Sequence, residues 1–285
     1  MTVTSNRQPV EFIMRNRHGF ASHLTVGVLA FAAGIGGTWL IRVRPTAKVA
    51  AHVHDEVTTH GETVWVTKPA GDSVRVYVAY PERKDRAPAV IVIHENQGLT
   101  TWEPTVADKL AGNGYVAAAV DLPSSMFGLY PADSGRAYIP RLTPDGVTAD
   151  LDAVYQYLNG LGAVKKDRIG VIGFCWGGGQ SFRYATNNPK LRAAVVCYGV
   201  APDTLAMPRI NAKILGVYGE ADARINTQLP MVSQTMQRLG KSFVADSYPG
   251  TGHGFLKPGR KGSDSDQPDK AWARILAFFG ENLGK

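Results

Sequence analysis

The sequence predicts an α/β fold in which a mainly parallel β-sheet carries helices on both faces. Strand-like and helix-like patterns alternate from residue 62 onward, as expected when crossover helices join parallel strands. Several strand-like runs are continuously apolar, which is typical of strands buried on both faces. In such sheets the ligand site lies at the carboxyl ends of the strands. The chemically active residues of this chain do follow strand-like runs, and this observation also favours the fold.

The first half of the predicted domain begins with two strands whose polar and apolar residues alternate. The turn-forming segment Pro69–Asp72 joins them as a hairpin. Two continuously apolar runs then predict buried strands, and Gly112 and Gly114 end the helix between them. A loop rich in Pro, Gly and Ser follows at 121–144, and structureless loops of that length are usually functional. The strands are expected at residues 62–67, 74–80, 89–94 and 115–120, and the helix at 104–111.

The second half opens with an amphipathic helix whose apolar residues, from Val147 to Leu158, recur at helical spacing. The apolar runs that follow it are short enough for strands buried in a parallel sheet. The final helix carries apolar side chains on one face, from Trp272 to Leu283. Strands are expected at 168–172, 193–198, 213–218 and 242–248, and helices at 147–158, 179–186, 229–239 and 272–283.

An uncharged apolar run at residues 24–41 precedes the domain, with arginines on both sides of it. Its length is at the lower edge of what spans a bilayer, and it is long for the core of a signal peptide. We therefore expect residues 1–51 to form an export signal or a membrane anchor, 52–61 a linker, and 62–285 the domain. The alternative is a hydrophobic helix packed on the domain. The first interpretation favours a periplasmic, secreted or membrane-anchored protein over a cytoplasmic one.

The chain has 285 residues and a formal net charge of +7, to which the arginines near the apolar run contribute. No Lys/Arg cluster with interleaved aromatic residues occurs in the domain, so no nucleic-acid partner is expected. The linker holds His52, His54 and His60 without a cysteine or carboxylate cluster of ligand spacing, so we expect no metal site. We also expect no cofactor, and the sequence leaves the oligomeric state open.

Residues 173–178, Gly-Phe-Cys-Trp-Gly-Gly, are the most informative segment of the chain. They lie between a strand-like run and a helix-compatible one, which is the layout of a nucleophile elbow. Glycines flank the apex because a strained turn leaves no room for side chains there. The apex is Cys175, so a thiol is the expected nucleophile. The second cysteine, Cys197, lies in a buried strand-like run and is expected to be an inert core thiol.

Two further residues complete a catalytic order along the chain. Asp222 follows the strand expected at 213–218, and His253 follows the one at 242–248. Nucleophile, acid and histidine in this order are typical of an α/β-hydrolase triad. His253 would take the thiol proton and later protonate the leaving group, while Asp222 orients the imidazole. A neighbouring imidazolium and a helix N-terminus both favour the thiolate form of a cysteine.

Each triad residue also has an ordinary interpretation when it is taken alone. Cys175 could be a buried thiol in a tight turn, Asp222 a helix cap, and His253 an exposed turn residue. Asp246 is a rival acid, but it lies inside a predicted strand. The joint order of the first three residues at strand ends favours catalysis.

The segment 94–99, His-Glu-Asn-Gln-Gly-Leu, follows another predicted strand. At this point a hydrolase of this class places a second donor to the oxyanion. We therefore expect the backbone N–H groups of Asn96 and Trp176 to form the oxyanion hole. A glutamate such as Glu95 is unusual at this place in an ordinary esterase. In this chain Glu95 could cap a helix, lie on the surface or touch the nucleophile.

Four segments, 94–99, 173–178, 219–222 and 252–255, together resemble the dienelactone hydrolase family, the carboxymethylenebutenolidase-like branch of the α/β-hydrolase superfamily. The resemblance extends over residues 62–285. It implies the α/β-hydrolase fold and hydrolysis of the enol-lactone ring of dienelactones through an acyl-cysteine. It also implies that Glu95 contacts the nucleophile and helps to form the thiolate when substrate arrives.

The resemblance further implies basic residues that hold a substrate carboxylate. Lys257, four residues after His253, stands where the family has an arginine, and Arg136 or Arg141 could supply the other. A lysine in place of arginine loses bidentate geometry. We expect a hydrolase of a small ester or lactone. The alternatives are a thioesterase or general carboxylesterase with the same triad, and a non-catalytic, membrane-tethered binding protein, against which the intact triad argues.

Overall fold

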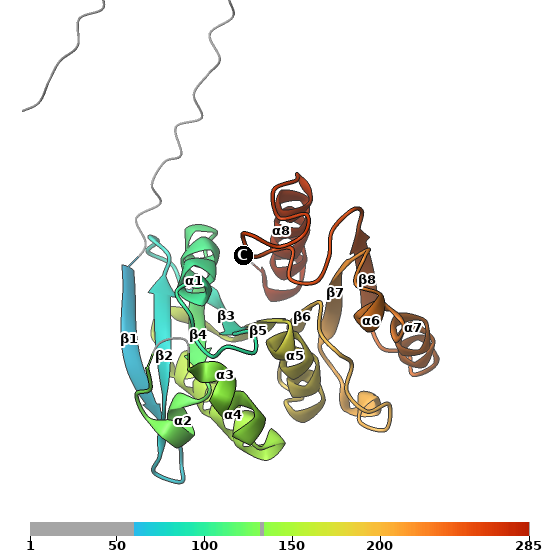
Figure 1. Ribbon diagram of the computed structural model, residues 1–285. Coiled ribbons are helices and arrows are strands. Elements are labelled where there is room, and N and C mark those ends of the chain that lie inside the picture. Colours follow the sequence, from blue (N-terminus) through green and yellow to red (C-terminus); the bar gives the residue numbers. More distant parts are fainter. Residues whose placement is uncertain (1–59, 132–133, 285) are drawn as a thin grey trace, which may run out of the picture. The chain divides into compact units, whose positions relative to one another are not determined.

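The computed structural model describes residues 60–131 and 134–284. These residues form a sheet of eight strands in the order β1-β2-β4-β3-β5-β6-β7-β8 (Figure 1). The strands are β1 (His60–Thr67), β2 (Ser73–Tyr80), β3 (Ala87–Ile93), β4 (Val116–Asp121), β5 (Val164–Phe174), β6 (Ala193–Cys197), β7 (Lys213–Gly219) and β8 (Phe243–Tyr248).

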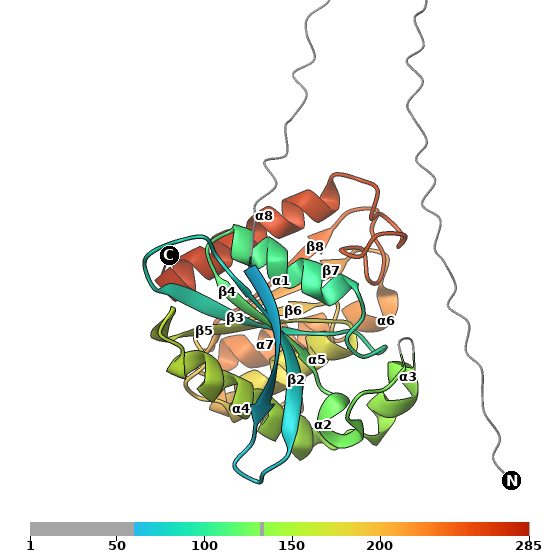
Figure 2. The ribbon, with the colours of Figure 1, turned by 90° about the vertical axis from the view of Figure 1, so that its left-hand side faces the viewer.

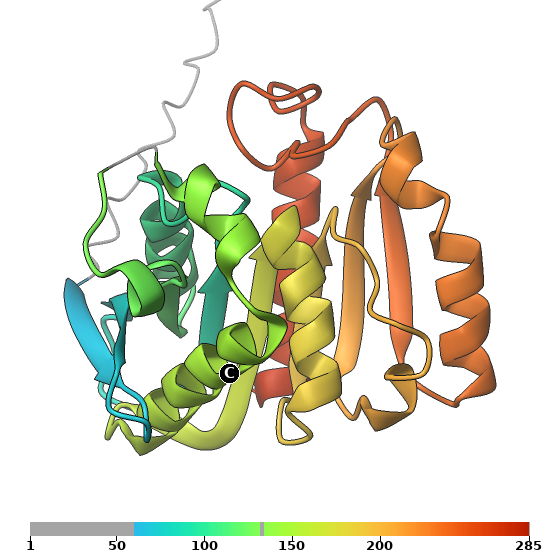
Figure 3. The same cartoon turned by 60° about the horizontal axis from the view of Figure 1, so that its bottom comes forward.

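Helices cover both faces of this sheet. In Figure 2, α1 and α8 lie on one side and α4 on the other, and Figure 3 shows α4 and α5 in front of the sheet with α8 behind it. The helices are α1 (Trp102–Gly112), α2 (Ser124–Phe127), α3 (Gly135–Tyr138), α4 (Pro144–Gly160), α5 (Trp176–Asn187), α6 (Ala223–Asn226), α7 (Leu229–Arg238) and α8 (Gln267–Phe279). Short 3-10 turns span Ile139–Arg141 and Met207–Arg209, and a π-helical turn spans Gly280–Gly284.

The strand directions confirm the predicted class. β1 pairs with β2 and β2 with β4 in antiparallel register, whereas all the pairs from β4 through β3, β5, β6 and β7 to β8 are parallel. The predicted hairpin is present, since the N–H of Lys68 donates to the Asp72 carbonyl across the turn at 2.8 Å. The parallel strands bring their carboxyl ends to one edge of the sheet, where the site residues were expected.

The core consists of two apolar layers, one on each face of the sheet. Every residue of β3 and β4 is buried, which explains why these strands read as continuous apolar runs. The layer under α4, α5 and α7 contains Val171 and Phe182, and the layer under α1 and α8 contains Ile172 and Phe174. Alternate residues of β5 thus anchor the strand on both faces just before the predicted elbow.

The long loop expected at 121–144 is not structureless, and this prediction was wrong. It contains α2, α3 and a 3-10 turn, and α4 already begins at Pro144. Thr143 caps α4 by accepting a hydrogen bond from the Gly146 N–H at 3.1 Å, and proline is favoured at the first helical position. Such four-residue helices are too short to show a periodic apolar pattern.

Other element boundaries differ by a few residues. β5 begins at Val164, four residues before the expected start, and α5 begins at Trp176 although its first residues include glycines. β1 begins at His60, which was expected in the linker; its Nδ1 lies 2.5 Å from Glu82 Oε1. Pairing with a neighbouring strand, which no local propensity reports, extends β1 and β5.

The predicted apolar segment at 24–41 lies outside the described residues, and its role as export signal or anchor stays a prediction. Within residues 60–131 and 134–284, no helix is both long and apolar enough to cross a membrane.

Candidate active site

The turn between β5 and α5 has the geometry of a nucleophile elbow. Cys175 has φ 54°, in the left-handed region that a non-glycine residue rarely adopts. A Cβ atom at Gly173 would lie 1.9 Å from the Gly177 carbonyl oxygen, so a side chain does not fit there. The chain therefore reverses sharply at Cys175, whose side chain is partly exposed at the start of α5. Strain of this kind is typical of functional sites.

The second cysteine, Cys197, stabilises the elbow through its backbone. The backbone N–H of Cys175 donates to the Cys197 carbonyl at 3.0 Å, where β6 ends beside β5. Both cysteines are free, and Cys197 is fully buried. Burial raises the pKa of the Cys197 thiol well above its usual value, so this thiol stays protonated and unreactive.

The predicted acid and base meet at the elbow. Asp222 follows β7 directly and is 6% exposed, and His253 lies in the loop after β8. The Nδ1–H of His253 donates to Asp222 Oδ2 at 2.5 Å. A hydrogen bond with Cys175 raises the pKa of His253; burial lowers it, and the bond with Asp222 raises it again. His253 is thus hydrogen-bonded to Asp222 and close enough to Cys175 for the thiol to raise its pKa.

Tyr198 is a further residue beside His253, and the sequence did not predict this contact. It follows β6, is fully buried and packs edge-on against the His253 ring, with 5.1 Å between ring centroids. Its φ is 42°, and no sequence pattern reports a dihedral angle of this kind. Tyr198 limits the positions open to the imidazole.

The loop after β3 lies against the elbow. A Cβ atom at Gly177 would fall 2.2 Å from the His94 carbonyl oxygen, so the backbones of α5 and of this loop are in close contact. The predicted oxyanion donors, Asn96 and Trp176, lie on the two sides of this contact. In the described part of the chain, neither of their backbone N–H groups donates to a protein acceptor. Both are therefore available to a substrate oxygen.

Glu95 and Lys257 form an ion pair beside this loop. Lys257 Nζ lies 3.2 Å from Glu95 Oε2, and the side chains are 18% and 5% exposed. The ammonium group also lies 5.1 Å from the centre of the Trp102 ring, within the range of a cation–π contact. No hydrogen bond recorded for the described residues joins Glu95 to Cys175. Glu95 and Lys257 are 162 positions apart in the sequence, and no local pattern could have predicted their ion pair.

The other candidate substrate residues do not join this cluster. Arg136 and Arg141 are exposed, and the Arg141 guanidinium lies over the Phe127 ring at 4.5 Å. Their role in binding substrate stays a prediction. The rival acid Asp246 lies within β8, as expected, and accepts a hydrogen bond from Arg274 Nε at 3.1 Å.

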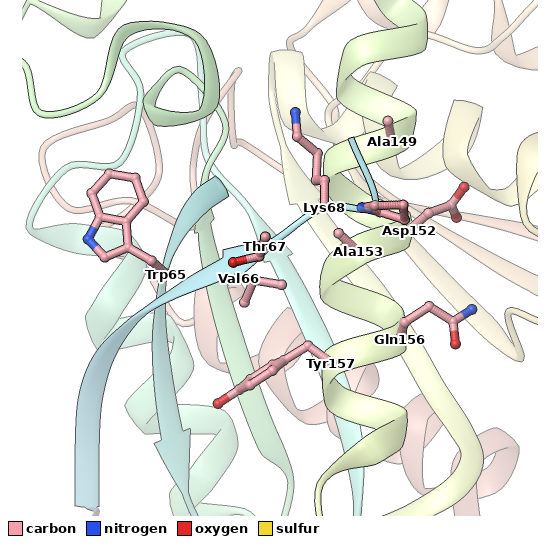
Figure 4. Close-up of a pocket in the computed structure, with 10 residues that line it drawn as sticks. Trp65, Val66, Thr67, Lys68, Ala149, Asp152, Ala153, Gln156 and Tyr157 are labelled. Atoms are coloured by element: carbon pink, nitrogen blue, oxygen red, sulfur yellow. The ribbon is translucent and has the colours of Figure 1, made fainter. Parts of the chain in front are cut away.

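The triad residues do not line the cavity of about 730 Å³ between the end of β1 and α4. Trp65 and Val66 lie on the strand side of that cavity, and Ala153 and Tyr157 lie on the helix side (Figure 4). Within the described ranges, no cluster of His, Cys, Asp and Glu could hold a metal ion. The arrangement at Cys175 offers the thiol a neighbouring base and offers a substrate oxygen two backbone N–H groups.

Comparison with known proteins identifies the family. The model of the dienelactone hydrolase family matches residues 74–283. The chain belongs to this family. A Salmonella typhimurium protein, provisionally named a carboxymethylenebutenolidase, is 31% identical over 263 residues, which cover 85% of this chain and 94% of that protein. A Bradyrhizobium protein, provisionally named a 2-oxo-3-(5-oxofuran-2-ylidene)propanoate lactonase, is 32% identical and covers 75% of this chain and 91% of its own.

Solved structures support the same fold. A crystal structure from Klebsiella pneumoniae, provisionally titled a dienelactone hydrolase, aligns with TM-score 0.70 and 24% identity over 79% of this chain and 99% of that one. A dienelactone hydrolase-like promiscuous phosphotriesterase from metagenomic libraries aligns with TM-score 0.70 and 20% identity, over 79% and 98%. Together with the family match, these likenesses make the chain a dienelactone hydrolase-like hydrolase with the α/β-hydrolase fold.

Proposed function

We propose that this hydrolase cleaves a small carboxylic ester or lactone through an acyl-cysteine intermediate on Cys175. The observation that supports the proposal is the hydrogen bond from His253 to Asp222 beside the Cys175 elbow, at the carboxyl edge of the parallel sheet. A thiol at a strained elbow, a base next to it and an acid behind the base are the parts that acyl transfer needs.

In the first half of the reaction, Cys175 Sγ attacks the carbonyl carbon of the ester. His253 Nδ1 is occupied by Asp222, so the other ring nitrogen takes the thiol proton. The carbonyl oxygen becomes an oxyanion, which the N–H groups of Asn96 and Trp176 stabilise. The bond to the alcohol oxygen then breaks, and His253 returns the proton to that oxygen.

In the second half, water attacks the carbonyl carbon of the acyl-cysteine. His253 takes a proton from the water, and the same two N–H groups hold the second oxyanion. The carbon–sulfur bond breaks, the proton passes to the sulfur of Cys175, and a carboxylic acid leaves. With a lactone, alcohol and acid are parts of one product, because the cleaved ring stays a single molecule.

Glu95 and Lys257 bear on the choice of substrate. A substrate carboxylate near Lys257 would compete with Glu95 for the ammonium group, because both would accept hydrogen bonds from the same Nζ. Glu95 would then be free to approach Cys175 and to assist thiolate formation. This places carboxylated lactones ahead of neutral esters as substrates.

The test of the nucleophile is hydrolysis of p-nitrophenyl acetate by Cys175→Ala. We expect turnover to be abolished while the circular dichroism spectrum is kept. Cys197→Ala is the matched control, because that thiol is buried away from the reaction; it should keep turnover. Wild-type turnover in Cys175→Ala would overturn the proposal.

The test of the substrate class compares Lys257→Met and Lys257→Arg on a carboxylated dienelactone and on a neutral ester. We expect Lys257→Met to raise KM for the charged lactone more than for the ester, and Lys257→Arg to restore it. An equal change for both substrates would show that Lys257 does not read the carboxylate.

We also propose that residues 1–51 export the protein or anchor it to a membrane. The uncharged run at 24–41 between arginines supports this. Fractionation of cells and N-terminal sequencing of the native protein test it, and an intact protein in the cytoplasm would contradict it.

A further inference from the structure

His94, the residue before Glu95, makes a hydrogen bond that no catalytic role assigned above explains. Its Nδ1 lies 2.6 Å from the Glu95 carbonyl oxygen, and its side chain is fully buried. A carbonyl oxygen can only accept, so Nδ1 carries the proton. Nε2 is buried without a partner among the described residues. Burial lowers the pKa of His94, so the ring is neutral and Nε2 holds a lone pair.

The acceptor of this bond belongs to the peptide group that carries an oxyanion donor. The Glu95 carbonyl and the Asn96 N–H are parts of one planar trans peptide unit and point in opposite directions. A donor that holds the carbonyl therefore also fixes the direction of the N–H. Hydrogen bonds in series polarise one another, so the same contact strengthens the Asn96 N–H as a donor.

His94 also contacts the residue that carries the other oxyanion donor. Its ring stacks on the Trp176 indole, with 5.4 Å between centroids and 10° between planes. Its carbonyl oxygen lies against Gly177, in the first turn of α5. One residue thus contacts both the peptide group that contains the Asn96 N–H and the side chain of Trp176.

The far end of the loop has hydrogen bonds that do not involve His94. Glu103, which is fully buried, accepts hydrogen bonds from the Thr100 N–H at 2.8 Å and from the Thr100 hydroxyl at 2.6 Å. The loop therefore keeps one anchor when His94 is changed, and a His94 variant can be tested as a folded protein.

We propose that His94 is a positioning residue of the oxyanion hole, which sets the direction of the Asn96 N–H through the Glu95 carbonyl and holds Trp176 by stacking. The inference rests on the proposed function, since it assigns these two N–H groups to the oxyanion. It adds a residue that touches neither the substrate nor the triad.

The kinetic test compares His94→Phe with His94→Asn. Phenylalanine keeps a ring against Trp176 but loses the donor, whereas asparagine places an N–H close to the position of Nδ1 and loses the ring. We expect His94→Phe to lower kcat for p-nitrophenyl acetate by about 10- to 100-fold with little change in KM, since a misdirected donor costs less than a deleted one. His94→Asn should recover most of this loss.

Alkylation of Cys175 by iodoacetamide is the control readout. Displacement of iodide by a thiolate forms no oxyanion, so the rate should be the same in wild type and in His94→Phe. Unchanged kcat in His94→Phe would overturn the inference, and so would a fall in alkylation parallel to kcat, because His94 would then support the elbow as a whole. Failure of the proposed function would look different: turnover would survive in Cys175→Ala.

A second measurement does not depend on turnover. Nitrogen-15 spectra of the histidine rings report which nitrogen carries the proton. We expect His94 to be neutral with the proton on Nδ1, and the Asn96 amide resonance to shift in His94→Phe. A proton on Nε2 of His94 would overturn the inference, because the bond to the Glu95 carbonyl would not exist.

Discussion

Gly177→Ala should lower activity by moving the loop after β3, which contains Asn96. The new Cβ would fall 2.2 Å from the His94 carbonyl oxygen and 2.6 Å from the Ile93 carbonyl oxygen. Cβ atoms rarely approach other atoms within 3.0–3.4 Å, so the two backbones must separate by about 1 Å. A displacement of about 1 Å at a catalytic group can cost roughly 100-fold in rate, or about 2.7 kcal/mol of transition-state stabilisation.

The assay is kcat/KM for p-nitrophenyl acetate, with urea unfolding of the same samples. Gly179→Ala, also in α5, is the matched control, because its Cβ would first meet a Val200 side-chain carbon at 3.0 Å. Alanine gains about 1 kcal/mol in a helix, so this control should fold at least as well as wild type and stay active. In Gly177→Ala, overpacking should lower the unfolding free energy by about 1–3 kcal/mol, and the helix propensity of alanine offsets part of this loss. Wild-type kcat/KM in Gly177→Ala would refute the contact between α5 and the loop as a determinant of the site.

Three further predictions concern the triad and the fold. Asp222→Asn should lower kcat by roughly 10³- to 10⁴-fold in a steady-state assay with unchanged folding, because the imidazole loses its orienting carboxylate. The pKa of His253 is raised from 6.5 in the folded state, so the stabilisation by its charged form is complete below pH 6.5 and is lost as the pH rises through the folded-state pKa. Urea unfolding should therefore show a larger difference in stability between wild type and His253→Gln in mildly acidic than in alkaline buffer. The opposite trend would contradict the direction of the pKa shift. Lys68→Met should cost about 3–5 kcal/mol of unfolding free energy, because Asp150, whose side chain is 2% exposed, would keep a buried charge without its cation. Adding Asp150→Leu to the Lys68→Met protein should recover most of the lost stability. Equal stability of wild type and Lys68→Met in urea unfolding would contradict this prediction.

The site residues that local sequence could predict are those whose role depends on position along a strand. Cys175, Asp222 and His253 each follow a predicted strand, and parallel pairing brings those strand ends to one edge. The need for glycines at the elbow could also be predicted, because a strained turn leaves no room for side chains. The close contact of Gly173 with the Gly177 carbonyl is an example.

The parts that sequence could not predict depend on contacts between distant segments. The segment after β4 packs on the loop after β3 at the start of α3, where a Cβ at Gly135 would lie 2.0 Å from the Gln97 carbonyl oxygen. A hydrogen bond from the Tyr130 hydroxyl to Asp121 ties the same segment down. The pairing of Glu95 with Lys257 depends on tertiary structure in the same way. Neither propensity nor periodicity contains these contacts.

Identification of the acylated residue is the most direct test of an acyl-cysteine intermediate on Cys175. Wild-type protein mixed with p-nitrophenyl acetate, quenched in acid and digested, is examined by peptide mass spectrometry. We expect an acetyl group on the peptide that contains Cys175 and none on the peptide that contains Cys197. An acetyl group on another residue, or full turnover after Cys175 has been blocked with iodoacetamide, would contradict it.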